Sequence, residues 1–364
     1  MGLPRETRTT WHDLELRVRA EDPGVLDYVS SQHRLAREDP DRAATRIDIE
    51  AVSSPSRLAE LTARPATERR ESYAGWWYGC HRNEDGAFVL VSQEGHEFPH
   101  ALITTDFLTW EIVTAHEHEL GLVVTRTMRE LVREHFVDRG ALMLHGAAAV
   151  LPDGTGVVLA GPSGAGKTSA SVQLARAGGH CVATDRCLLL ADGPEWAVVG
   201  LPLSTRLTRE AAAGLGIEPG EKDRLIRHGE AAVRRPDPKG KISLSNEEMR
   251  RLAGVEFLAS TRIDTLVLLE NTGAPRPLSG PVAEGEAVAA LAEHILVPDT
   301  AYRGRWLSAD PSPEPAGDVK GRLGELAAAV PARHGTWTPA TYKSDVLAAW
   351  LAPRAGAEKT GDPS

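Results

Sequence analysis

The sequence predicts an α/β fold in which a mixed sheet with flanking helices follows an α+β N-terminal domain. Three observations support this prediction. The first 139 residues alternate between strand-like and helix-like patterns, two apolar runs follow at residues 141–150 and 156–160, and a glycine-rich segment then separates a strand pattern from a helix pattern. We therefore expect an N-terminal domain over residues 1–140, a second domain over residues 141–308, and a linker, C-terminal helices and a disordered tail over residues 309–364.

The N-terminal domain is expected to be rich in strands. A hairpin is predicted around Asn83-Glu84-Asp85-Gly86, because a glycine-containing turn separates two strand patterns there. Residues 119–138 have apolar side chains near helical spacing, and Gly140 is expected to end that helix. The predicted strands cover residues 14–18, 45–52, 76–80, 87–91, 101–104 and 108–113.

The second domain is expected to open with a hairpin. Residues 141–150 and 156–160 are both apolar, and Pro152-Asp153-Gly154-Thr155 joins them. A tight turn through Asp153-Gly154 predicts an antiparallel pair in which His145 lies opposite Pro162. This register would place His145 beside the glycine-rich segment, although the pleat leaves the direction of its ring open.

The glycine-rich segment is the most specific motif of the chain. Gly161-Pro162-Ser163-Gly164-Ala165-Gly166-Lys167-Thr168 matches G-x-x-x-x-G-K-[ST] at every fixed position, between a strand pattern at residues 156–160 and a helix pattern at residues 168–177. This pattern is typical of loops that hold nucleotide phosphates, since the helix N-terminus points N–H groups and a positive dipole end at the loop. The sequence therefore predicts a nucleoside triphosphate site.

Each loop residue has an expected role in that site. The three glycines let the backbone approach phosphate, Lys167 reaches the β- and γ-phosphates, and the Thr168 hydroxyl binds Mg²⁺. Ser169 follows them and helps to start the helix. We expect ATP and Mg²⁺, although a loop that contacts only phosphates does not distinguish ATP from GTP.

Further elements are expected downstream of the loop. A short strand over residues 181–183 ends at Thr184-Asp185, and another over residues 265–270 ends at Glu270. Residues 205–250 are charged and weakly periodic, and residues 311–315 are typical of a linker. The remaining expected elements are strands at residues 188–191 and 196–201 and helices at residues 285–296, 319–330 and 341–351. The C-terminal helices are expected to pack against the chain's own core in preference to a partner.

Composition excludes several classes of protein. The formal net charge of −10 argues against a nucleic-acid partner, because no basic face would release counterions. The three cysteines include no CxxC pair, which argues against a disulfide framework or a zinc site. No apolar run approaches the length of a membrane span, so we expect no membrane partner and a cytoplasmic location.

The order of motifs resembles a known family. Leu144-His145-Gly146 precedes the strand pair and the loop, and Thr184-Asp185 follows after one more strand. This arrangement resembles the kinase domain of bacterial HPr kinase/phosphorylase over about residues 141–305, most specifically around residues 144–187. The resemblance implies a P-loop domain of HPr-kinase type, transfer of phosphate from ATP to a serine or threonine hydroxyl of a protein or peptide, and a homo-oligomer. A small-molecule hydroxyl stays open as the acceptor.

The chain departs from that family at one important position. The family has an Asp-Asp pair after the strand, whereas Thr184 stands in the first place here and Asp185 matches the second. His145 and Glu270 are candidates for the missing role, Glu270 as a metal ligand beside Thr168 and Asp185. The family's phosphorylase signature is not recognisable, so we do not predict phosphorolysis.

Other polar residues are weaker candidates for the site. Arg206 ranks first as an additional clamp on phosphate or on an anionic acceptor, ahead of Lys239 and Lys241. The signatures of an ABC-type ATPase and of a GTPase base-recognition box are both missing.

The sequence thus predicts a phosphotransferase in which Lys167 and Thr168 hold ATP and Mg²⁺. Asp185 would orient or deprotonate the acceptor hydroxyl. The alternatives are an ATP-binding regulatory protein, or a slow ATPase, without kinase activity. A third possible function is that of an assembly module built on the C-terminal helices.

Overall fold

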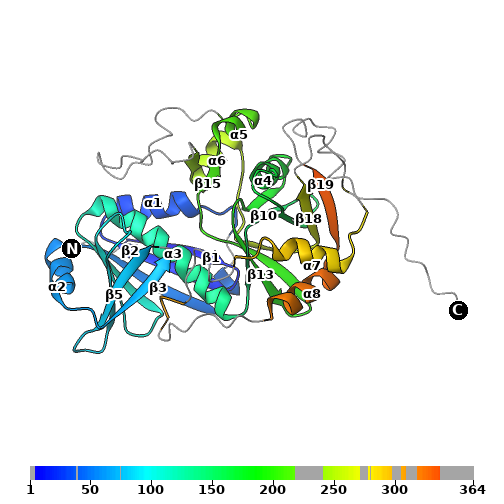
Figure 1. The fold of residues 1–364 in the computed structure, drawn as a ribbon. Coiled ribbons are helices and arrows are strands. Elements are labelled where there is room, and N and C mark those ends of the chain that lie inside the picture. The colour runs from blue at the N-terminus through cyan, green and yellow to red at the C-terminus, as the bar shows by residue number, and fades with distance from the viewer. Residues whose placement is uncertain are drawn as a thin grey trace.

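The protein is a mixed α/β structure with eight α-helices and four sheets in its described part (Figure 1). The computed structural model describes residues 5–37, 40–73, 75–217, 241–270, 278, 280–296, 305–308 and 318–336. This confirms the expectation of a mixed α/β fold with mixed sheets. The expected linker at residues 311–315, the helix at residues 341–351, the disordered tail and Lys239 lie outside the described residues.

The N-terminal part of the chain forms one eight-stranded sheet with the order β1-β2-β3-β8-β7-β6-β5-β4. Strands β2, β3 and β8 pair in parallel, and the other neighbours are antiparallel. The six strands predicted here are confirmed, while the first and fourth strands were not predicted because their apolar side chains do not alternate. The strands are β1 (Arg5–Trp11), β2 (Leu14–Ala20), β3 (Thr45–Ser53), β4 (Glu68–Tyr73), β5 (Trp76–Arg82), β6 (Phe88–Ser92), β7 (His100–Thr104) and β8 (Thr109–Thr114).

Helices cover both faces of this sheet. α1 (Pro23–His33) and α3 (Glu117–Asp138) pack on one face, and α2 (Pro55–Ala63) packs on the other. The helix predicted at residues 119–138 is confirmed, and Gly140 follows it with a φ of 83°. The core under α3 also includes Leu188, Leu190 and Val199, which makes the apolar interior continuous across residue 140. The division into domains at that residue stays a prediction.

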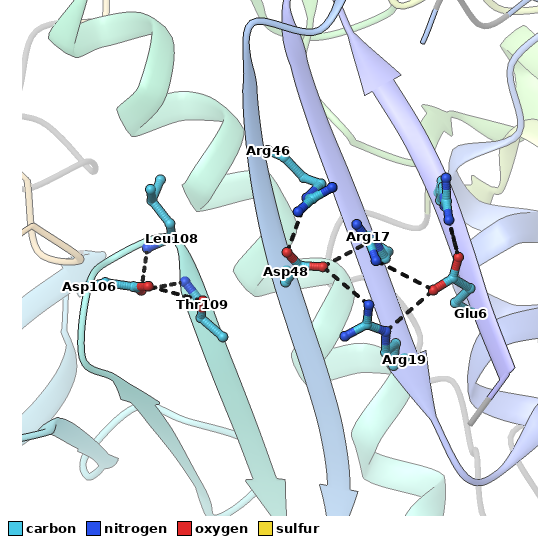
Figure 2. Close-up of polar contacts among 9 residues, drawn as sticks. Glu6, Arg17, Arg19, Arg46, Asp48, Asp106, Leu108 and Thr109 are labelled. Carbon is cyan, nitrogen blue, oxygen red and sulfur yellow. Dashed lines mark hydrogen bonds and ion pairs between the residues drawn. The ribbon is translucent and has the colours of Figure 1, made fainter. Parts of the chain in front are cut away.

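The face of β1–β3 away from α1 and α3 bears a ladder of charges. Figure 2 shows Asp48 between Arg17 and Arg46, with N–O separations of 3.1 and 3.2 Å. Glu6 extends the ladder to Arg19 at 3.3 Å. Because side chains alternate along a strand, these charges face outward where their neighbours face the core.

The turn between β7 and β8 is drawn in the same view. Asp106 accepts hydrogen bonds from the backbone N–H groups of Thr109 at 2.7 Å and Leu108 at 2.9 Å. This carboxylate therefore stabilises the turn locally, as short polar side chains commonly do.

A five-stranded sheet with the order β12-β10-β11-β18-β19 follows. Only β10 runs against the others, because it pairs antiparallel with both neighbours while β11, β18 and β19 pair in parallel. α4 (Lys167–Arg176) covers one face, and α7 (Glu284–Ala292) and α8 (Val319–Ala329) cover the other. The strands are β10 (Ala147–Val150), β11 (Gly156–Ala160), β12 (His180–Ala183), β18 (Thr265–Glu270) and β19 (Ala332–Thr336).

The prediction that the helix after residue 318 packs against the chain's own core is confirmed. Leu323 and Leu326 of α8 are fully buried in an apolar cluster with α7 and the five-stranded sheet. Helix α7 is confirmed as well, although it ends at Ala292, four residues before the predicted end.

Two smaller sheets complete the described fold. A four-stranded sheet has the order β17-β14-β13-β9, and a two-stranded sheet pairs β15 with β16. Residues 205–250 were expected to be weakly periodic, but their described part contains two helices, of which α6 starts with a capping box between Ser245 and Glu248. The elements are β9 (Leu142–Leu144), β13 (Cys187–Asp192), β14 (Glu195–Gly200), β17 (Ser260–Arg262), β15 (Thr205–Leu207), β16 (Ile242–Leu244), α5 (Arg209–Gly214) and α6 (Asn246–Ala253).

The predicted hairpin of residues 141–160 is partly wrong. Residues 141–150 do not form one strand, because β9 and β10 belong to different sheets. The register of β10 and β11 is also shifted by one residue, since Val150 pairs with Gly156. The cause is the turn: Leu151 N–H bonds to Thr155 O at 2.9 Å, and Gly154 has a φ of 90°, so three residues turn instead of two.

No helix in the described part of the chain is both long and apolar enough to cross a lipid bilayer.

Candidate functional site

The candidate site lies where several strands of the five-stranded sheet end. β11, β12 and β18 run in the same direction, so their carboxyl ends meet at one edge of the sheet. Gly161 follows β11, Thr184-Asp185 follow β12, and Glu270 ends β18. Ligands of open α/β sheets commonly bind outside the carboxyl ends of the strands.

The backbone of residues 161–166 requires glycine at defined places. Gly161 has a φ of 149°, and a Cβ atom there would lie 2.4 Å from the carbonyl oxygen of Leu269 in β18. Gly164 and Gly166 have φ values of 86° and 90°, in the left-handed region that other residues rarely adopt. The sequence thus lets the loop turn sharply against β18 before α4 begins.

Lys167 begins α4 and folds back over the loop. Its side chain is buried, and Nζ donates hydrogen bonds to the carbonyl oxygens of Gly161 at 2.7 Å and Pro162 at 3.1 Å. Burial lowers the pKa of Lys167, Asp185 opposes that shift, and the positive charge of Lys241 adds to it. The ammonium group is therefore held over the loop by carbonyl oxygens, with a carboxylate nearby.

Thr168 and Ser169 occupy the first turn of α4. The Thr168 hydroxyl donates a hydrogen bond of 2.7 Å to the backbone carbonyl of Thr184, which ties α4 to the end of β12. Ser169 is buried within the same helix. Thr184 is itself only 5% exposed, and it makes this contact through its backbone carbonyl.

Asp185 places a carboxylate at this edge of the sheet, just after β12. Its Oδ1 lies 3.6 Å from Nε2 of His145, and its Oδ2 lies 3.5 Å from Nε of Arg186. Burial acts to raise the pKa of Asp185, but the close His145 ring and the charges of Arg186 and Lys241 outweigh it and lower the pKa to about 2. The group is accordingly an anion at neutral pH.

His145 meets Asp185 by a route that the sequence did not predict. It does not pair with Pro162, since it lies between β9 and β10, outside the hairpin. Its backbone N–H instead donates to the carbonyl oxygen of His294 at 2.8 Å, beside a bridge between Leu144 and the residue after His294. The segment after α7 therefore holds His145.

Glu270 and Arg206 lie apart from this contact. Glu270 Oε1 lies 3.0 Å from Nδ1 of His334, whose Nε2 lies 2.8 Å from Oε1 of Glu286. Glu270 therefore lies at the same edge of the sheet as Gly161 and Asp185, but its side chain pairs with His334 of β19. Arg206 lies on β15 opposite Ser243, with an exposed side chain.

The structure adds two residues that sequence reasoning missed. Burial, followed by the charges of Lys167 and His145, lowers the pKa of His294. Arg186 contacts Asp185 directly, and its position next to that residue in the sequence is a signal that could have identified it. No sequence signal identifies His294, because it reaches the site through strand pairing between distant segments.

The Thr168 hydroxyl and the Asp185 carboxylate suit a small, hard cation that is also bound by the phosphates of a substrate. Among the described residues, no three His, Cys, Asp or Glu side chains gather as a metal site. Mg²⁺ typically takes one or two carboxylates together with substrate phosphates, so a hydroxyl and a single carboxylate suit it.

Among solved proteins the chain has a distant structural neighbour. No protein-family model and no curated protein matches this chain. A solved structure of an HPr(Ser) kinase/phosphatase from Coxiella burnetii is similar at 12% identity, over 38% of this chain and 70% of that chain, with a TM-score of 0.21. Because that TM-score lies below the level of a shared fold, we derive the function from this chain's own residues.

Proposed function

We propose that this protein binds ATP at residues 161–168 and transfers the γ-phosphate to a hydroxyl group. The observation that carries the proposal is the junction of Lys167, Thr168 and Asp185 at the carboxyl ends of β11 and β12. There the Thr168 hydroxyl contacts the Thr184 carbonyl, and Asp185 lies close enough to Lys167 to act against the lowering of that lysine's pKa. Phosphoryl transfer depends on positioning and charge stabilisation, which these groups supply.

Each residue has a defined task in the proposed reaction. The loop N–H groups and Lys167 hold the β- and γ-phosphates, and the lysine exchanges its two loop carbonyls for phosphate oxygens. Mg²⁺, held by Thr168 and Asp185, would neutralise negative charge on the phosphates. His145 holds Asp185 in place at 3.6 Å.

The low pKa of Asp185 favours orientation over proton removal. A carboxylate with a pKa of about 2 is a weak base at neutral pH, whereas an efficient general base has a pKa near the working pH. In the transfer, the acceptor oxygen bonds to the γ-phosphorus as that atom's bond to the bridging oxygen breaks. ADP leaves with the bonding electrons, and the hydroxyl proton passes to water.

The test measures transfer of labelled γ-phosphate from ATP, with Mg²⁺, in lysate of the source organism. Wild type is compared with Lys167→Ala and Asp185→Asn, and with two controls far from the site, Lys320→Ala on α8 and Asp153→Asn in the β10–β11 turn. We expect labelling by wild type and both controls, and a loss of about 10²–10³-fold for the site variants, the scale of removing one group that stabilises charge in a transition state.

Binding separates this proposal from its alternative. If wild type binds ATP but labels no acceptor, the protein is a nucleotide-binding regulator, in line with Thr184 in the place of a carboxylate. If Lys167→Ala binds ATP as tightly as wild type, residues 161–168 are not the nucleotide site.

A further inference from the structure

Residues 294–296, which follow α7, lie along the end of β9 next to the candidate site. An antiparallel bridge joins Leu144 to Ile295. The backbone N–H of His145 donates a hydrogen bond of 2.8 Å to the carbonyl oxygen of His294. In an antiparallel pair this pattern places His294 directly opposite His145.

The pleat of this pair decides where the two histidine side chains point. Leu144 is fully buried, and Ile295 packs against the same apolar cluster, which also contains side chains of α7 and α8. Because side chains alternate between the two faces and opposite residues share a face, His145 and His294 both point away from that cluster. On this other face, Nε2 of His145 lies 3.6 Å from Oδ1 of Asp185. The His294 ring is therefore on the side of the candidate site.

The charges that act on His294 agree with this placement. Burial lowers its pKa most, and the positive charge of Lys167 lowers it further. Glu293 acts against this shift, and His145 adds a smaller lowering. The ring is therefore neutral at pH 7, with one donor and one acceptor nitrogen, and it lies within electrostatic reach of the Lys167 ammonium group.

A bound triphosphate would change the surroundings of this histidine. In the proposed function Lys167 holds both the β- and the γ-phosphate, and His145 holds the carboxylate on the acceptor side of the γ-phosphate. A side chain next to both of these residues is close to the γ-phosphate. Phosphate oxygens accept strong hydrogen bonds from imidazole N–H groups, and their negative charge favours the protonated ring.

We propose that His294 donates a hydrogen bond to the γ-phosphate and so makes the site prefer a nucleoside triphosphate over a diphosphate. This inference rests on the proposed function, because it assigns a specificity-determining residue of the same site. The two parts of His294 then have separate tasks, since its backbone carbonyl holds His145 and its side chain binds phosphate. The variant His294→Ala keeps the backbone contact and removes only the side chain.

The test measures binding and does not require turnover. Titration calorimetry with Mg²⁺ compares the affinities for ADP and for AMP-PNP, an ATP analogue whose γ-phosphoryl group is not readily transferred. We expect His294→Ala to weaken AMP-PNP by about tenfold or more, the scale of one hydrogen bond to a charged group, and to leave ADP within about twofold of wild type. His180→Ala is the matched control, because His180 is also half-buried but begins β12 at the opposite edge of the same sheet. The control should change neither affinity.

A pH series adds a readout that a purely structural role of the side chain would not change. Because bound phosphate favours the protonated imidazole, wild type should gain affinity for AMP-PNP relative to His294→Ala as the pH falls from about 8 to about 6. His180→Ala should follow the wild-type pH dependence.

The possible results separate this inference from the proposed function. The inference is overturned if His294→Ala binds AMP-PNP as tightly as wild type, if it weakens AMP-PNP and ADP equally, or if it keeps the wild-type pH dependence. A wild-type protein that binds neither nucleotide would overturn the proposed function, and this inference with it.

Discussion

The eight-stranded and the five-stranded sheets use the same residue types differently. In the first, His100 is buried, with Nε2 2.7 Å from the Tyr78 hydroxyl and Nδ1 2.8 Å from the carbonyl of Phe98. Next to the second, in the segment between β9 and β10, the side chain of His145 is 36% exposed and lies beside an ionised carboxylate. A histidine that is buried and paired stabilises a core, whereas one at a strand edge beside charge is available for chemistry.

The difference extends to the backbone. Gly86, in a turn of the eight-stranded sheet, has open space around it, while Gly161 lies against the backbone of β18. An added side chain should therefore be tolerated better at Gly86 than at Gly161. Three measurements test this contrast.

The largest effect is expected from Gly161→Ala. The new Cβ would meet the Leu269 carbonyl in a backbone conformation that side chains rarely adopt, so we expect a loss of about 3 kcal/mol in the free energy of unfolding and a loss of ATP binding. Gly86→Ala, with a φ of 85° and open space around it, should cost about 1 kcal/mol. Urea denaturation measures both. Equal losses would contradict the claim that the edge of the five-stranded sheet is the more constrained.

A smaller effect concerns the pH dependence of stability. Burial lowers the pKa of His100 to about 3, so between pH 6.5 and that value the unfolded chain binds the proton more tightly and stability falls as pH falls. At about 1.4 kcal/mol per pH unit, His100→Asn should lose about 2 kcal/mol less than wild type between pH 7 and pH 5. His116→Asn, at an exposed position, is the control and should keep the wild-type slope. A parallel slope for His100→Asn would mean that His100 does not titrate with unfolding.

The smallest effect is expected on the charged face of the eight-stranded sheet. Asp48 pairs with Arg17 and Arg46 and keeps 24% of its side chain exposed, so Asp48→Ala should cost about 1 kcal/mol at low salt and less at high salt. Glu195→Ala removes a single exposed pair with Arg262, at 3.1 Å, and should change stability within experimental error. A salt-independent loss for Asp48→Ala would indicate a packing role in place of charge pairing.

Much of the fold could be predicted because local sequence decides it. Residues 156–160, the glycine-rich loop and the start of α4 follow from neighbouring side chains and backbone freedom, and each was predicted within a residue. Strand β1 was not predictable in this way, because its threonines and arginines show no alternation and it forms by pairing with β2. Similarly, Ser245 and Glu248 form a capping box in a segment whose apolar periodicity is weak.

The glycine-rich motif of residues 161–168 and the carboxylate after β12 could be identified from the sequence, because each is a short contiguous segment. Their surroundings depend on the tertiary structure. His145 meets Asp185 through a segment about 150 residues away in the chain, and His294 of that segment lies opposite His145. Such contacts depend on how sheets pack and how distant segments pair, which residue spacing does not encode.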